Sequence, residues 1–262
     1  MKIQVQPLNE LYVIHDNSIV DEGARYYEVY VNQDGKSFSN LTSRGNVYTA
    51  WSLKPGVVYD FTVSAFGEDK SKSRESKVLT ASTSTEAPMQ PILTDISSTE
   101  ATLEWADIPG AVKYILYYVK DDEKKSQETT KTKIVVTDLE PGQWYDFSVV
   151  SVGSGGEKSE ESDLLDEQTV PLIPANVRAK TVEMDHITVI WDKSAGASSY
   201  KLTYNWQDDD RETRKETVNT ESTSVNLSNL TPGTKYEIKV LAIGQTGSRT
   251  QQSKSLIENT ST

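Results

Sequence analysis

The 262-residue sequence has no cysteine and only two histidines. Without cysteine there is neither a disulfide framework nor a thiolate for metal binding or nucleophilic catalysis. Long apolar runs are missing as well: stretches such as residues 114–119 are far shorter than the roughly 18 residues of a membrane-spanning helix. We therefore expect no membrane insertion by this part of the protein.

Helical periodicity is also missing. Apolar residues recur at every second position between clusters of glycine, proline and serine, which is the pattern of half-buried β-strands. The sequence therefore predicts an all-β fold.

One short motif, Leu-x-Pro-Gly-x-x-Tyr, occurs three times. Proline and glycine together favour a tight turn, and the tyrosine begins a second alternating strand from which its hydroxyl can return to the backbone near the turn. The tyrosines lie 86 and 91 residues apart, so the spacing indicates three repeated domains. The motifs lie at 53–59, 139–145 and 230–236, in a first repeat (1–85), a middle repeat (86–171) and a third repeat (172–262).

A second set of residues keeps the same spacing in two of the repeats. Trp105 and Trp191 end predicted strands, and each stands nine residues before a tyrosine, Tyr114 or Tyr200, that starts the next strand. We expect both tryptophans in sandwich cores. In the first repeat His15 takes the tryptophan position, so that repeat is divergent.

These tryptophans, strand-starting tyrosines and Pro-Gly corners resemble fibronectin type III repeats. The resemblance implies three tandem immunoglobulin-like β-sandwiches joined by short proline-bearing linkers, and hence an elongated rod. Residues 13–27, followed by compact repeats without cysteine, resemble the membrane-distal end of receptor-type tyrosine phosphatases with all-fibronectin extracellular regions. That family would place ligand binding outside the cell and a phosphatase, absent from this chain, inside. Tenascin-like matrix proteins, adhesion receptors and cytokine-type receptors use the same repeat.

The net charge of −12 is concentrated in the middle repeat, which has 7 basic against 18 acidic residues. The first repeat has 9 against 10 and the third 11 against 11. This balance disfavours nucleic acid and anionic lipid, and a partner selected by charge would be basic. The alternative is that the acidic excess only keeps the surface soluble.

No constellation of catalytic, cofactor-binding or metal-binding residues is recognisable, so we expect no enzyme activity and no cofactor. Two functions remain. The chain is either an extracellular protein-binding or adhesion module of a cell-surface or secreted protein, or a passive spacer in a matrix protein or a secreted multidomain enzyme. A spacer has no reason to expose an apolar face.

Strand parity places an apolar outer face on the middle repeat, if the corner tyrosine points inward. We expect this face, with acidic surroundings, to contact a protein ligand or to support weak self-association. A loop or a neighbouring repeat that covers the face is the alternative. Four Asn-x-Ser/Thr triplets are N-glycosylation candidates, although chance alone yields about two or three. The face comprises Ile115, Tyr117, Trp144 and Val150, and the triplets begin at Asn40, Asn226, Asn229 and Asn259.

Overall fold

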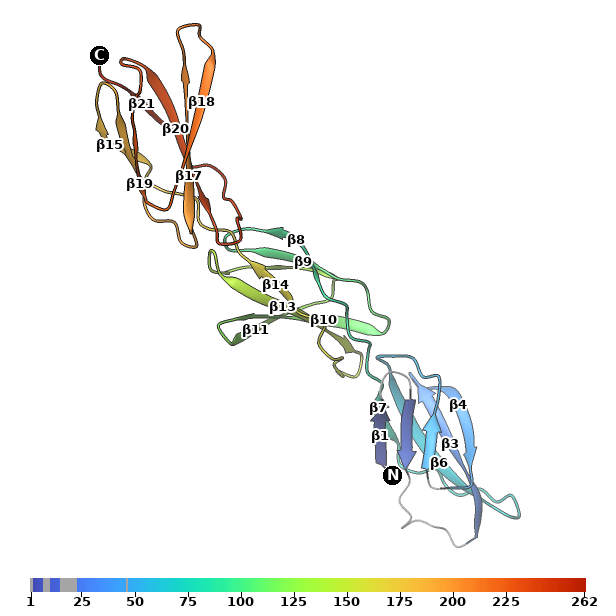
Figure 1. Ribbon diagram of the computed structural model, residues 1–262. Helices are drawn as coiled ribbons and strands as arrows, with labels where there is room; N and C mark the ends of the chain where they lie inside the picture. Colours follow the sequence, from blue (N-terminus) through green and yellow to red (C-terminus); the bar gives the residue numbers. More distant parts are fainter. Residues whose placement is uncertain (1, 7–9, 15–22, 46) are drawn as a thin grey trace. The chain divides into compact units, whose positions relative to one another are not determined.

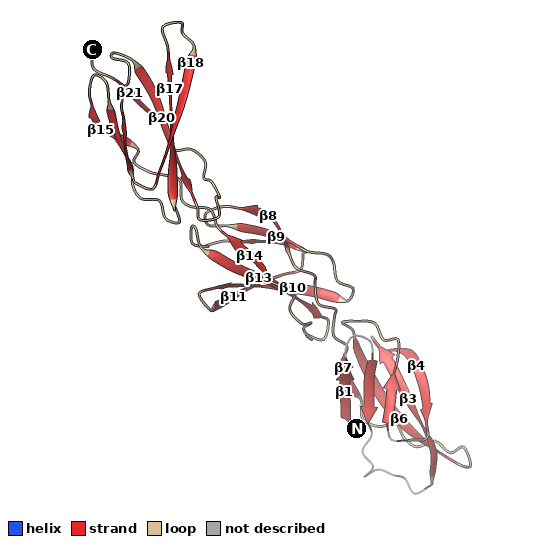
Figure 2. Ribbon diagram, viewed as in Figure 1, coloured by secondary structure: helices blue, strands red, loops and turns tan. Residues whose placement is uncertain are grey.

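The structure is a computed structural model that describes residues 2–6, 10–14, 23–45 and 47–262. All regular secondary structure in these residues is β-strand (Figures 1 and 2). The all-β prediction is therefore confirmed, since alternating apolar positions fit the two faces of a strand and not a helical stripe. None of the described residues forms a helix that could cross a membrane. His15 lies outside the described residues.

The chain divides into two compact units, and the division passes through the middle repeat. The first unit holds both sheets of the first repeat, and the second unit holds both sheets of the third. The first unit comprises Met1–Ile92, Glu104–Ile134 and Phe147–Leu165, and the second comprises Leu93–Leu103, Val135–Asp146 and Asp166–Thr262.

Within the described residues, each repeat has a three-stranded and a four-stranded sheet. In the first repeat the orders are β1 (Lys2–Gln6), β2 (Glu10–Ile14), β5 (Val47–Ala50) and β4 (Lys36–Ser43), β3 (Ala24–Gln33), β6 (Val58–Gly67), β7 (Leu79–Ser82). In the middle repeat they are β12 (Lys133–Val136), β9 (Ala101–Glu104), β8 (Ile92–Ile96) and β11 (Glu123–Thr129), β10 (Ala111–Lys120), β13 (Trp144–Gly153), β14 (Leu165–Gln168).

The third repeat has the same strand order. Its sheets are β15 (Arg178–Val182), β16 (Ile187–Ile190), β19 (Ser224–Leu227) and β18 (Thr213–Thr220), β17 (Ser199–Gln207), β20 (Lys235–Ile243), β21 (Leu256–Asn259). The first repeat thus keeps the strand order of the other two although it lacks their tryptophan.

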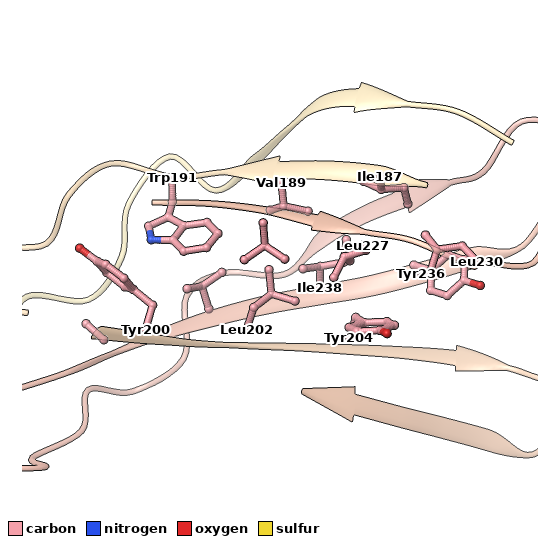
Figure 3. Close-up of a cluster of buried hydrophobic side chains, with 13 residues drawn as sticks. Ile187, Val189, Trp191, Tyr200, Leu202, Tyr204, Leu227, Leu230, Tyr236 and Ile238 are labelled. Carbon is pink, nitrogen blue, oxygen red and sulfur yellow. The ribbon is translucent and has the colours of Figure 1, made fainter. Parts of the chain in front are cut away.

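The core of the third repeat shows how the alternating residues pack (Figure 3). Trp191 is only 4% exposed, and its ring meets that of Tyr200 edge to face at 5.4 Å between centroids. Leu202 and Ile238 are fully buried in the same cluster. In the middle repeat Trp105 is 7% exposed, so the prediction that both tryptophans are core residues is confirmed.

The three corners have the geometry that their sequence predicts. Each corner tyrosine hydroxyl accepts the N–H of the residue before the corner proline, at 2.8, 2.9 and 2.9 Å in chain order. The corner glycines have φ of 67°, 67° and 66°, in the left-handed region where a side chain is strained. The tyrosines are Tyr59, Tyr145 and Tyr236, and the glycines are Gly56, Gly142 and Gly233.

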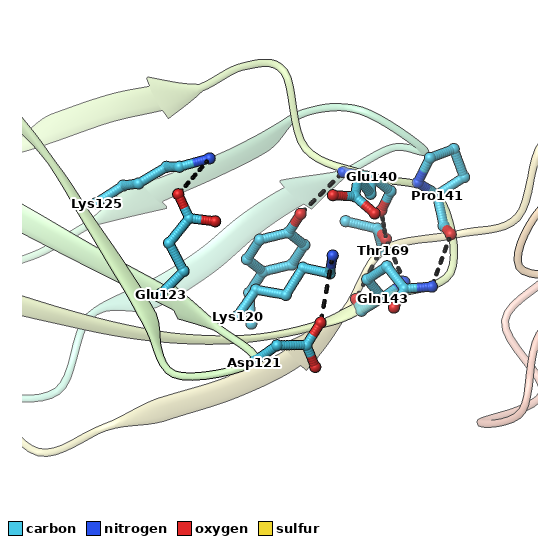
Figure 4. A network of polar contacts seen from close by, with 9 residues as sticks. Lys120, Asp121, Glu123, Lys125, Glu140, Pro141, Gln143 and Thr169 are labelled. Atoms are coloured by element: carbon cyan, nitrogen blue, oxygen red, sulfur yellow. Dashed lines mark hydrogen bonds and ion pairs between the residues drawn. The ribbon is translucent and has the colours of Figure 1, made fainter.

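A threonine that the sequence analysis did not single out closes each corner, and we call this contact the threonine latch. Figure 4 shows the latch of the middle repeat, which Thr169 forms. In each repeat the threonine hydroxyl donates to the carbonyl oxygen before the corner proline, at 2.6, 2.6 and 2.7 Å. It accepts the N–H after the corner glycine at 3.1, 3.0 and 2.9 Å. The latch therefore ties the last residues of each sandwich to its corner. The threonines are Thr83, Thr169 and Thr260, and they are 0%, 0% and 3% exposed.

Candidate protein-binding face

The predicted outer face of the middle repeat is only partly exposed. Trp144, the first residue of β13, is 44% exposed, as expected. Tyr117 in β10 is half-buried. Ile115 and Val150 are 4% and 3% exposed, so the prediction of an exposed apolar face is wrong at these two positions.

Long charged side chains lie beside two residues of this face, Ile115 and Tyr117. Glu128 stands opposite Ile115 in the β10–β11 register and forms an ion pair with Lys113 at 2.8 Å. The ammonium of Lys124 lies 4.1 Å from the centroid of the Tyr117 ring. Because lysine and glutamate carry apolar stems, such side chains cover apolar surface while their charges stay in water. A position at which strand alternation predicts an outward side chain is therefore not necessarily exposed to solvent on this face.

A polar network holds this covering in place. Lys158 donates to the Tyr117 hydroxyl at 3.3 Å. Glu161 pairs with Lys124 at 2.5 Å and accepts the hydroxyl of Ser148 at 2.8 Å. These two contacts, the lysine first, lower the pKa of the Glu161 carboxyl, and partial burial opposes them. With its ring face and its hydroxyl both engaged, Tyr117 does not offer a free aromatic anchor.

The first repeat contains a related network, which the sequence analysis missed; its lysine, Lys72, stands at the position of Lys158 and not at that of Lys124. Lys72 lies 4.6 Å from the centroid of the Tyr30 ring and 3.6 Å from the carboxylate of Glu75. Glu75 accepts the hydroxyl of Thr62 at 3.0 Å. The sequence signal was available: a hydroxyl residue stands 13 positions before a glutamate, and a lysine stands three before it, in both repeats. The third repeat has Thr203 at the tyrosine position.

Two carboxylates accompany Trp144 on the corner side of β13. Asp146 follows it by two residues and therefore points to the same side of the strand. The pKa of Asp166 in β14 is raised, mainly by burial and further by the charge of Asp146. Neither carboxylate has a cationic partner among the residues that the structure describes. We call Trp144, Asp146 and Asp166 the Trp144 cluster.

Within the described part of the chain, no three histidine, aspartate or glutamate side chains are grouped closely enough to hold a metal ion. What the cluster offers is an exposed aromatic ring beside uncompensated negative charge. That is the composition of a protein contact with an aromatic anchor.

Comparison with known proteins identifies the fold. The family model of the fibronectin type III domain matches residues 86–167 and 172–258, which is more than half of the chain. The chain belongs to the fibronectin type III family. The predicted fibronectin type III repeats are confirmed for the middle and third repeats, and the first has the same strand order. Thr169 and Thr260 of the latch lie just beyond the two matched segments.

The relatives include receptors and matrix proteins. The chain is 26% identical over 231 residues to receptor-type tyrosine-protein phosphatase eta of Gallus gallus, covering 87% of this chain and 16% of the relative. It is 29% identical over 202 residues to tenascin-N of Homo sapiens, covering 74% and 15%. The chain thus spans about a sixth of the length of these relatives. A solved two-domain fibronectin type III segment of chicken tenascin is 21% identical with a TM-score of 0.46, covering 68% of this chain and 100% of that one.

The glycosylation candidates are spread over the first and third repeats, and all four asparagines are exposed. Asn226 lies in β19 between buried Val225 and Leu227, so its side chain points away from the core. Asn229 has φ of 57°, a left-handed conformation that asparagine tolerates. The remaining two are Asn40 in β4 and Asn259 in β21.

Proposed function

We propose that this chain is an extracellular protein-binding module, from the membrane-distal ligand-binding region of a cell-surface receptor of the receptor tyrosine phosphatase type. The relatives support a receptor or matrix setting, because both receptor-type phosphatases and tenascins match most of this chain. The repeats themselves hold no phosphatase, and ligand binding is their part of such a receptor. In this setting the three repeats present side chains on stable sandwiches to a partner outside the cell.

The exposed Trp144 carries this proposal. A tryptophan buries a large apolar area at low conformational cost, and it is therefore enriched among residues that dominate binding energy. Asp146 and Asp166, which have no cation beside them in the described residues, would attract a basic partner and speed its approach. The middle repeat also carries most of the net negative charge. The partner is thus a protein with a basic surface that accepts an aromatic side chain.

The second candidate is the passive spacer, in a matrix protein or a secreted multidomain enzyme. The polar networks over Tyr30 and Tyr117 favour it, because they close two outer faces that a binding module would leave open. The two functions differ in what Trp144 does. In a spacer its ring has no partner, and its removal changes nothing outside the chain.

The experiment is cell binding by a fluorescent tetramer of the full chain, measured by flow cytometry with Trp144→Ala as the test variant. Trp51→Ala is the matched control, since Trp51 is also a surface tryptophan, 58% exposed in the first repeat. We expect Trp144→Ala to lower binding roughly tenfold, the cost of losing a moderate hot spot, and Trp51→Ala to leave it unchanged. If the unmodified tetramer does not bind cells, or binds equally well without Trp144, the spacer function is preferred.

A further inference from the structure

One sheet face of the third repeat is basic. Residues that stand opposite each other on neighbouring strands have their side chains on the same face of the sheet. The core residues of β17 and β20 occupy the inner face, so the residues that alternate with them point outward. Lys239 stands opposite Thr203, and Lys215 stands opposite Asn205 on the other side of β17. The lysines on this outward face are Lys201, Lys215, Lys235 and Lys239, which we call the lysine face.

Most of the positive charge on this face is not neutralised. Lys239 pairs with Glu237 at 2.9 Å. The other three lysines have no ion pair among the described residues. The face also carries Ile257, which is 54% exposed and stands opposite Glu237 in the β20–β21 register. The lysine face is therefore a surface with positive charge and an apolar side chain at its edge.

The Trp144 cluster has the complementary character. It combines an exposed indole ring with two carboxylates that lack a cationic partner in the described residues. A lysine ammonium is attracted both by carboxylates and by the face of a tryptophan ring. Lys235 occupies in β20 the place that Trp144 occupies in β13, so the same position of the fold carries opposite chemistry in the two repeats.

The geometry points to a second copy of this chain as the partner: the Trp144 cluster of one copy binds the lysine face of the other. This inference rests on the proposed function and names the basic surface that the middle repeat binds. The contact joins two different surfaces, so each bound copy still has one free Trp144 cluster or one free lysine face. Association therefore continues from copy to copy unless the ends of an assembly meet.

Salt dependence follows from the charges. Exposed charges interact over a Debye length, which falls from about 30 Å at 0.01 M salt to about 8 Å at 0.15 M. Sedimentation velocity of the full chain over a concentration series should show association that weakens as salt is added. Trp144→Ala should weaken it roughly tenfold, with unchanged melting.

Charge reversal provides the decisive test. The acid variant is Asp146→Lys with Asp166→Lys, and the lysine variant is Lys215→Glu with Lys235→Glu. Neither variant alone should self-associate, since each brings like charges together. A mixture of the two should associate, because the lysine variant keeps a native Trp144 cluster and the acid variant keeps a native lysine face. The control is Lys180→Glu with Lys193→Glu, two exposed lysines that lie outside β17 and β20. It changes the net charge by the same amount as the lysine variant and should leave association intact.

The outcomes separate this inference from the proposed function. An unmodified chain that stays monomeric at low salt overturns self-association, and Trp144-dependent cell binding by the tetramer would still support a different basic partner. Association that survives both charge-reversed variants, or a mixture that fails to associate, also overturns the inference, since another surface would then be in contact. If the tetramer in addition shows no Trp144-dependent binding, the proposed function fails with it.

Discussion

Replacing Thr260 by valine should destabilise the third repeat by about 2 kcal/mol. The hydroxyl makes two short hydrogen bonds at the corner, donating to the Thr231 carbonyl at 2.7 Å and accepting the Thr234 N–H at 2.9 Å. A net contribution of about 1 kcal/mol for each bond yields the total. Valine has nearly the same shape, so packing is little changed and the loss reports the hydrogen bonds.

The measurement is urea unfolding of the full chain, monitored by hydrogen–deuterium exchange. Peptides from each repeat report its unfolding separately. Protection should fall in the third repeat and stay unchanged in the first. Thr260→Ser keeps the hydroxyl and should retain most of the stability. Thr217→Val is the matched control, since Thr217 is an exposed strand residue whose hydroxyl makes no hydrogen bond within the described residues, and it should shift unfolding by less than about 0.5 kcal/mol. If Thr260→Val behaves like Thr217→Val, the latch is not a source of stability.

Three further predictions concern the core, the acid range and the surface. Trp191→Ala should cost on the order of 3–5 kcal/mol in the third repeat alone, whereas Trp191→Phe should cost less, because the indole N–H makes no hydrogen bond within the described residues; an unmoved third-repeat transition in denaturation would contradict the core assignment. The lowered pKa of Glu161 means that its stabilising contribution is present above the ordinary glutamate pKa of roughly 4.3 and is lost as pH falls through the folded value. Comparison of Glu161→Gln with the unmodified chain should thus show a difference at pH 6 that disappears at pH 2, and equal stability at pH 6 would refute it. Expression in a secreting eukaryotic cell followed by glycosidase digestion should lower the mass, and an unchanged mass would speak against glycosylation at Asn40, Asn226, Asn229 and Asn259.

The corners show what the sequence alone could determine. Proline and glycine restrict the turn locally, and the strict alternation after Tyr236 separates core from surface without knowledge of any other strand. The same local rule placed Trp191 in the core and Trp144 outside it, and both positions agree with the structure. The repeat spacing extends this pattern to a prediction of three domains, of which the middle and third match the family model.

Burial on the outer face was decided by the tertiary structure. Strand parity predicts exposure at Ile115 and Val150, yet both are buried, and the ion pair opposite Ile115 joins residues 15 apart in the sequence. Alternation is a property of one strand, whereas covering depends on which side chains neighbouring strands and loops bring to the same face. The threonine latch has the same origin, since Thr260 contacts a turn 26 to 29 residues earlier. A pattern of period two contains no information about such partners.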